Sequence, residues 1–226
     1  MKSILLASAC CVCSFILIAQ EGNLVPNPSF EEFIDCPQST TELQTQVLDW
    51  FSWQESPDFF HVCNNEGLGT AGVPDNAWGS QTPVLGNAYI GLFTYHDTFD
   101  NGREYVAAQL LEPLVVGQDY YLLFYASSYD GGVLEDKHCF TNNIGLRFFK
   151  DPDYGTTTPI NPLTPDNFAH LNSAEIIDNT EDWVLIQGWF TADNDYNWLC
   201  IGNFFGFAEV NRGASVIPLI LGGVHK

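Results

Sequence analysis

The stretch Gly22-Asn-Leu-Val-Pro-Asn-Pro-Ser-Phe-Glu-Glu32 sets the first expectation about the fold. Leu24 and Val25 can open a β-strand, but the two prolines that follow lack a backbone donor and interrupt a continuous ladder. Extended chain can resume after them, with Phe30 and Phe33 available for burial. The pattern fits two structures equally well. One is a kinked strand that leaves one sheet and enters another at the corner of a β-sandwich, and the other is an ordinary N-terminal strand.

The composition favours an all-β chain with an acidic surface. Its 226 residues suit one large all-β domain or two small ones, and 14% aromatic residues with a single Met favour a core built from sheets. The chain has 28 Asp and Glu against 7 Lys and Arg, and the net charge of -21 argues against binding nucleic acid or anionic lipid. That charge suits a soluble surface alone, a cation site, or a neutral ligand such as a sugar.

Residues 1–19 are typical of a secretory signal peptide, with Lys2 followed by an apolar run that ends at Ala19. The run is too short for a stable membrane span, and no other stretch approaches the roughly 20 apolar residues that a transmembrane helix needs. We therefore expect a secreted, cell-surface protein that is cleaved after Ala19 and is not inserted in a membrane afterwards. A lipoprotein with its lipid on Cys10 is the alternative.

Seven further segments follow the opening stretch in order: Cys36-Pro37, Pro57 to Cys63, Val73 to Gly79, Gly86 to Gly91, Arg103 to Tyr105, Leu110 to Tyr121, and Ile201 to Phe205. With Asn23 to Glu31 they resemble a family of secreted jelly-roll domains on the surface of certain Gram-negative bacteria. That family is similar in fold to galactose-binding-like domains and carbohydrate-binding modules. The resemblance implies an all-β, two-sheet antiparallel β-sandwich over residues 20–209, and it says little about the ligand because one fold hosts many functions.

Eight segments have the composition of β-strands, and none shows sustained helical periodicity. They are Val47 to Trp53, Asp58 to Cys63, Asn87 to Phe93, Glu104 to Leu111, Asp119 to Ser127, Asn143 to Phe149, Trp183 to Ala192, and Asn197 to Phe205. The fourth and fifth are predicted to form a hairpin, and the last two to form another pair. Lys150 to Asp182 is expected to be a long excursion with one short strand near Ile176.

The C-terminus departs from the family pattern, in which a final strand ends in Asp-Asp-Val. Residues 210–226 instead form an atypical tail with Pro218 inside its apolar run. Because proline breaks a ladder, we predict that this tail is not a well-packed central strand and is weakly protected from hydrogen exchange beyond Arg212.

Four cysteines remain after signal removal, and an even number in an exported chain suggests disulfides. The resemblance implies that Cys36 pairs with Cys63, since both lie in family-like segments. Pairing of Cys139 with Cys200 then follows by elimination.

A structural Ca²⁺ near the first strand is a further implication of the resemblance. Glu31 matches the position that supplies an oxygen there, and Asn27 is the neighbouring candidate ligand. The usual partner in the closing strand is missing, so ordinary surface acids are the alternative.

Strand alternation gathers candidate ligand-binding residues on one side of three predicted strands, and these are Tyr121, Tyr125, Arg147, Gln187 and Trp189. Flat rings with hydrogen-bonding groups suit a half-wet binding surface, and Trp189 with Tyr125 is the expected platform. Alternatively, the excursion of residues 150–182 buries these rings. A second possible location is the loop rim, with Asn76, Trp78, Tyr95 and Arg103.

The chain has no Gly-x-Ser-x-Gly elbow, no His-Glu-x-x-His and no phosphate loop. We therefore expect a non-catalytic cell-surface module that recognises carbohydrate or another neutral surface ligand, with a glycan or surface protein as partner. The alternatives are a structural or adhesion module of an outer-membrane or secreted assembly with no small ligand, and a glycoside hydrolase built on paired carboxylates.

Overall fold

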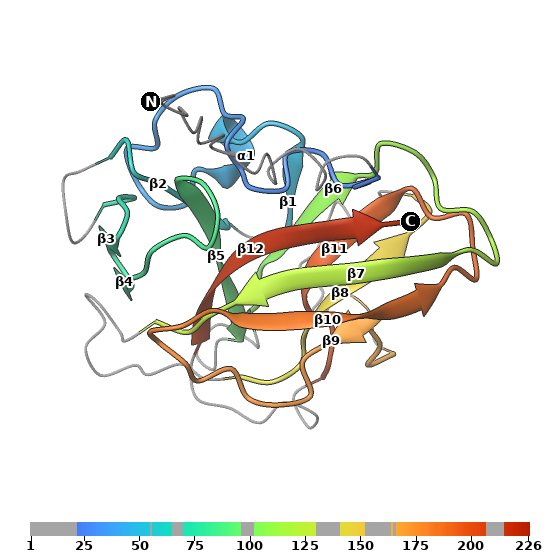
Figure 1. Ribbon diagram of the computed structural model, residues 1–226. Helices are drawn as coiled ribbons and strands as arrows, with labels where there is room; N and C mark the ends of the chain where they lie inside the picture. The colour runs from blue at the N-terminus through green and yellow to red at the C-terminus, as the bar shows by residue number, and fades with distance from the viewer. Residues whose placement is uncertain are drawn as a thin grey trace, which may run out of the picture.

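The computed structural model describes residues 22–54, 56–64, 70–95, 102–129, 141–151, 164, 166–206 and 215–226. They form two antiparallel sheets packed face to face, the predicted β-sandwich (Figure 1). Sheet I has the order β1 (Trp50–Gln54), β6 (Tyr105–Gln109), β11 (Trp198–Asn203), β8 (Ile144–Phe149) and β9 (Leu171–Asn172). Sheet II has the order β10 (Val184–Thr191), β7 (Asp119–Ala126), β12 (Ser215–His225), β5 (Ala88–Tyr95) and β2 (Asp58–His61).

The remaining elements are a short helix and a small ribbon. Helix α1 (Leu43–Gln46) precedes β1, and the ribbon pairs β3 (Asp75–Asn76) with β4 (Gly79–Ser80). Each of the eight segments predicted as strands overlaps one, whereas the helix, the ribbon, β9 and β12 were not predicted. Near Ile176 the described chain forms a single bridge, between Ile177 and Thr141. Within the described ranges, no helix is both long and apolar enough to cross a membrane.

The core lies between the sheets and follows the alternation of side chains along each strand. In β7, Tyr120, Leu122, Phe124 and Ala126 point inward and are buried, while the residues between them are partly exposed. In β10 the same pattern turns Ile186 toward the core. The inward and outward faces predicted for these two strands are therefore confirmed.

The predicted hairpin of β6 with β7 and the predicted pairing of β10 with β11 are both wrong, because β6 and β11 join sheet I while β7 and β10 join sheet II. The two connections cross between the sheets together and bond to each other. The N–H of Leu110 donates to Asn197 O, that of Leu114 to Tyr196 O, and that of Gly117 to Ala192 O, at 2.9, 2.7 and 2.7 Å. Each connection thus provides hydrogen-bond partners for the backbone of the other. This allows both short connections to pass from one sheet to the other.

The prediction for the C-terminal tail is also wrong. Strand β12 lies between β5 and β7, in the middle of sheet II (Figure 1). Pro218 is tolerated because it pairs with Gly91 of β5 in a part of β12 that has one neighbour, and pairing with β7 begins only at Leu219. Val224 is fully buried in the core. The sandwich therefore extends past residue 209.

The opening stretch bonds to both sheets, but through single bridges and not as a strand. The N–H of Leu24 donates to the carbonyl of Val224 in β12, and Leu24 O accepts from the N–H of Leu111, which follows β6. Asn27 and Phe30 have positive φ angles of 42° and 60°, which turn the chain so that the Phe30 ring enters the core against Trp50. The stretch thus contacts both sheets, as the kinked-strand interpretation expected, but it forms neither of the two predicted strands.

The Cys36–Cys63 disulfide is confirmed, with Cα atoms 6.0 Å apart. Pairing of Cys139 with Cys200 is wrong, because Cys200 is a free thiol and is fully buried. It lies in the middle of sheet I, in register with Ala107 of β6 and Arg147 of β8. Burial raises the pKa of this thiol well above its usual value, which makes it unreactive. Cys139 and the predicted signal peptide lie outside the described residues.

Candidate functional site

The outer face of sheet II carries an exposed tryptophan. Trp189 of β10 is 72% exposed, and the ladder register places it opposite Tyr121 of β7. The two ring centroids are 5.0 Å apart, with the planes inclined by 53°. The Tyr121 hydroxyl donates to Gln187 Oε1 at 2.6 Å. Because Gln187 is also exposed, Tyr121 braces both an indole ring and an amide on an open surface.

Strand β12 extends this surface by one more ring. His225 is in register with Tyr121, and Gly223 with Leu123. Gly223 has φ +148°, and a Cβ there would lie 2.6 Å from both the Asn23 side chain and His225 Nε2, so the position requires glycine. We call this outer surface the Trp189 face, and its residues are Trp189, Gln187, Tyr121, Leu123 and His225. Sequence reasoning missed His225, because no motif marks it and the tail was not expected to join the sheet.

Tyr125 does not take part in the Trp189 face, although it was the predicted partner of Trp189. It is opposite Leu185 in register, about 13 Å along β7 from Tyr121. There it packs, partly buried, against a separate aromatic cluster that includes Phe60, Tyr89 and Tyr129. The partner of Trp189 is Tyr121, one strand across, and the expected Trp189–Tyr125 platform is wrong.

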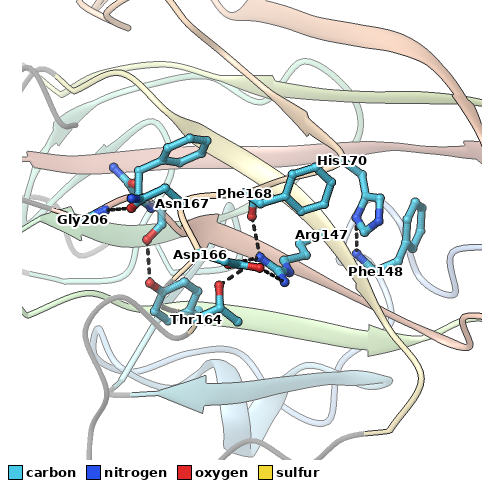
Figure 2. Close-up of polar contacts among 11 residues, drawn as sticks. Arg147, Phe148, Thr164, Asp166, Asn167, Phe168, His170 and Gly206 are labelled. Atoms are coloured by element: carbon cyan, nitrogen blue, oxygen red, sulfur yellow. Dashed lines mark hydrogen bonds and ion pairs between the residues drawn. The ribbon is translucent and has the colours of Figure 1, made fainter.

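Arg147 lies on the other sheet, so it cannot contribute to the Trp189 face. Its side chain projects from the outer face of β8 and is held by Thr164, Asp166 and Phe168, as Figure 2 shows. The guanidinium donates to both carboxylate oxygens of Asp166 at 2.7 and 2.8 Å, and to Thr164 and the carbonyl of Phe168. Hydrogen bonding from Arg147 lowers the pKa of Asp166 to about 2. Thr164, Asp166 and Phe168 thus engage the Arg147 guanidinium, whereas Trp189 stays exposed.

The ring of His170 lies among several aromatic rings. Its Nδ1 accepts from the backbone N–H of Phe148 at 3.0 Å (Figure 2), and its ring is 4.7 Å from that of Phe190 and 5.2 Å from that of Tyr196. Burial lowers the pKa of His170 to about 4, partly offset by the charge of nearby Asp193, while Arg147 adds to the lowering. His170 is therefore neutral at physiological pH and serves as a packing residue.

The predicted loop-rim location does not form an exposed site. Asn76 and Arg103 are fully buried. Asn76 donates to the hydroxyl of Tyr89 at 2.6 Å, and Arg103 donates to the carbonyls of Asn203 and Phe205. The side chain of Tyr95 lies outside the described residues.

Trp78, the last rim candidate, anchors its loop to a buried carboxylate. Its Nε1–H donates to Asp58 Oδ2 at 2.5 Å, and the N–H of Thr41 donates to Oδ1 at 2.8 Å. Burial raises the pKa of Asp58 to about 6, against the lowering effect of these two hydrogen bonds. Asp58 therefore holds the loops that contain Trp78 and Thr41 against strand β2, and its carboxylate is buried when it is charged.

Asp58 and His170 predict opposite pH dependences of the free energy of unfolding. Asp58 titrates near pH 3.8 unfolded and about 6 folded, so its stabilising contribution is complete below pH 3.8 and is lost as the pH rises through 6. His170 titrates near pH 6.5 unfolded and about 4 folded, so its contribution is complete above pH 6.5 and is lost as the pH falls through 4. Each change is on the order of 3 kcal/mol at most.

Urea unfolding of the wild type, Asp58→Asn and His170→Asn between about pH 4 and pH 7 checks this pair of effects. As the pH rises, the wild type should lose stability relative to Asp58→Asn and gain it relative to His170→Asn. Other acidic groups affect all three proteins alike and cancel in the differences. Differences that stay constant with pH would contradict both assignments.

The predicted calcium ligands are engaged in hydrogen bonds. Glu31 accepts from the backbone N–H and the side-chain amide of Asn87 at 2.5 and 3.0 Å. Asn27 Oδ1 accepts from the N–H of Glu32 at 3.0 Å, and its amide donates to two carbonyls. Within the described ranges no group of three or more His, Cys, Asp or Glu side chains could hold a metal ion. Calcium binding at Glu31 and Asn27 stays a prediction.

No protein family model matches the chain, and no curated protein matches it in sequence. Similar solved structures include the CBM22-1 and GH10 modules of the Clostridium thermocellum xylanase 10B with xylohexaose, at 9% identity and a TM-score of 0.42. A CBM4 structure matches at 15% and 0.40, and an apo cyclase from Fischerella sp. at 12% and 0.48. The matches cover 91%, 89% and 88% of this chain, and 28%, 98% and 95% of those chains. The chain thus spans less than a third of the xylanase chain. Similarity at this level carries neither ligand nor activity over to it.

Proposed function

We propose that the protein is a non-catalytic module that binds a neutral carbohydrate on the Trp189 face. The observation that supports this most is the exposure of Trp189, which is 72% exposed while held on an eight-residue strand with a regular ladder. An indole ring held on a sheet, open to solvent and in contact with the Tyr121 ring of the neighbouring strand, offers a sugar a flat apolar surface that needs little ordering on binding. The proposed place of action is the cell surface, for which the signal-like residues 1–19 are the reason.

Hydrogen-bonding groups flank the ring on the same face. Gln187 Oε1 accepts from the Tyr121 hydroxyl, which leaves the Gln187 amide N–H groups as donors and the Tyr121 oxygen as an acceptor. The Asp119 carboxylate is fixed by the hydroxyl of Thr191 at 2.5 Å, at the end of the same strand pair. A pyranose that stacks its C–H face on Trp189 could therefore bond its rim hydroxyls to fixed partners.

The charge distribution favours a neutral ligand. Of the four basic side chains in the described residues, Arg103 is buried, and the other three are ion-paired. Lys226, which follows His225 on β12, pairs with Glu112. The described surface therefore offers no unpaired basic side chain of the kind that sulfate or phosphate recognition prefers.

Trp189→Ala is expected to weaken carbohydrate binding by about 1–3 kcal/mol, the size expected for a central aromatic anchor. It should leave the fold unchanged, because the ring is exposed. The measurement is a calorimetric titration of the wild type and of Trp189→Ala with neutral hexasaccharides of glucose, xylose, mannose and galactose. Leu111→Ala is the matched control, since Leu111 is 67% exposed on the connection between β6 and β7. Wild-type binding that survives Trp189→Ala, or that Leu111→Ala weakens equally, would contradict the proposal.

A further inference from the structure

Strand β10 forms an open edge of sheet II. The N–H of Ala192 donates to Gln118 O, and Ala192 O accepts from Gly117, so residue 192 faces the β7 side. Because backbone groups alternate along an antiparallel strand, the even-numbered residues of β10 face β7 and the odd-numbered ones face outward. The outward residues are Leu185, Gln187, Trp189 and Thr191. No described residue makes a hydrogen bond to their N–H or C=O groups.

This edge lacks the usual protection of free strands, which is a charge, a proline or a bulge. The sequence Val-Leu-Ile-Gln-Gly-Trp-Phe-Thr is uncharged, and its eight residues pair with β7 without a break in register. Leu185 is 40% exposed. The core-facing Val184 and Phe190 pack against the core but remain partly exposed.

The opposite edge of the same sheet is closed. All four residues of β2 are buried. The N–H of His61 donates to Ala71 O at 3.1 Å, and the loop at Thr41 bonds to Asp58. Among the described residues, one edge of sheet II is thus bonded to the protein's own chain, whereas the β10 edge has no such partner.

Acidic residues flank the open edge on both sides. Glu181 and Asp182 precede β10, and Asp193 and Asp195 follow it; all four are exposed, and Asp195 is paired with Lys150. We propose that the β10 edge binds an extended peptide strand of another protein, uncharged in its middle and carrying Lys or Arg at both ends. The peptide would pair with the outward backbone groups of β10, and its basic ends would meet these carboxylates. The proposal uses backbone groups and is independent of carbohydrate binding on the Trp189 face.

A second copy of this chain fits the edge poorly. Antiparallel pairing of β10 with itself, centred on Gln187, would set Glu181 of one copy opposite Asp193 of the other, and a shift of one pair brings Glu181 opposite Asp195. Like charges directly opposite each other destabilise a sheet. Each chain also carries a net charge of -21.

A fluorescein-labelled peptide, Lys-Lys-Thr-Val-Thr-Val-Thr-Lys-Lys, tests the proposal by fluorescence anisotropy. It should bind the wild type, and Leu185→Pro should weaken it by about tenfold or more, because proline removes an outward N–H without removing a bond to β7. Leu185→Ala keeps that donor and should stay within about threefold of the wild type. The peptide with Glu in place of Lys should not bind.

One further measurement does not depend on the folding of Leu185→Pro. Methylating alternate backbone nitrogens of the Lys-flanked peptide should abolish its binding to the wild type. Equal binding of the Glu-flanked or methylated peptide, equal binding by Leu185→Pro, or no binding by the wild type would overturn the proposal. So would sedimentation showing a wild-type dimer that Leu185→Pro converts to monomer, since the edge would then belong to a second copy.

Discussion

Deleting residues 215–226 is expected to abolish folding of the sandwich. Strand β12 is the element that joins β5 and β2 to β7 and β10 in the described sheet. Its removal would leave two strand edges unpaired inside sheet II and would take Val224 from the core. Each unpaired buried backbone group costs about 1–3 kcal/mol. Summed over the strands that would lose a long central neighbour, this cost exceeds the roughly 5–15 kcal/mol by which a typical domain is stable.

Far-ultraviolet circular dichroism with thermal unfolding checks this deletion. The truncated chain should show no cooperative transition. Deleting Lys226 alone is the matched control, because this exposed residue contributes only an ion pair with Glu112 and its loss should change stability little. A cooperative transition near that of the wild type in the truncated chain would show that β12 is dispensable, as the sequence-based prediction held.

Replacing both Cys36 and Cys63 with Ser is expected to lower the free energy of unfolding by about 3 kcal/mol. The bond closes a loop with a sequence separation of 27, and the chain-entropy model assigns about 3 kcal/mol or slightly more to a loop of this size. The loop is also held by Asn64, whose amide donates to Pro37 O at 2.8 Å, so the native contacts should survive. Urea unfolding measures the difference.

Dithiothreitol provides the control for the disulfide. The reductant should destabilise the wild type as much as the double substitution does. It should not affect the double variant, because Cys200 is a free thiol in the core of sheet I. Further destabilisation of the double variant by dithiothreitol would show a second disulfide and restore the pairing that the structure contradicts.

Alternation along the strands predicted which side chains face outward, and this is how Trp189, Gln187 and Tyr121 could be found from the sequence. The pattern has a period of two and is local, so it fixes the two sides of a strand. It does not fix the sheet that a strand joins. Arg147 was therefore placed with Trp189, although β8 belongs to sheet I.

The connections between strands were harder to predict than the strands. A short apolar connection such as residues 110–118 is typical of a hairpin, and only its hydrogen bonds to residues 192–197 show that it crosses between sheets. The same holds for β12, where Pro218 argued against a central strand and the offset pairing with β5 and β7 removes the conflict. Both errors concern contacts between residues far apart in the sequence.

The indole ¹H–¹⁵N spectrum tests the central claim most directly, because each of the six tryptophans gives one signal. The signal absent from Trp189→Phe identifies Trp189. On addition of the neutral hexasaccharide that binds best, that signal should shift, while those of buried Trp53 and Trp198 on sheet I should not. A shift of the Trp53 or Trp198 signals with Trp189 unchanged would place the ligand on the other sheet and contradict the account.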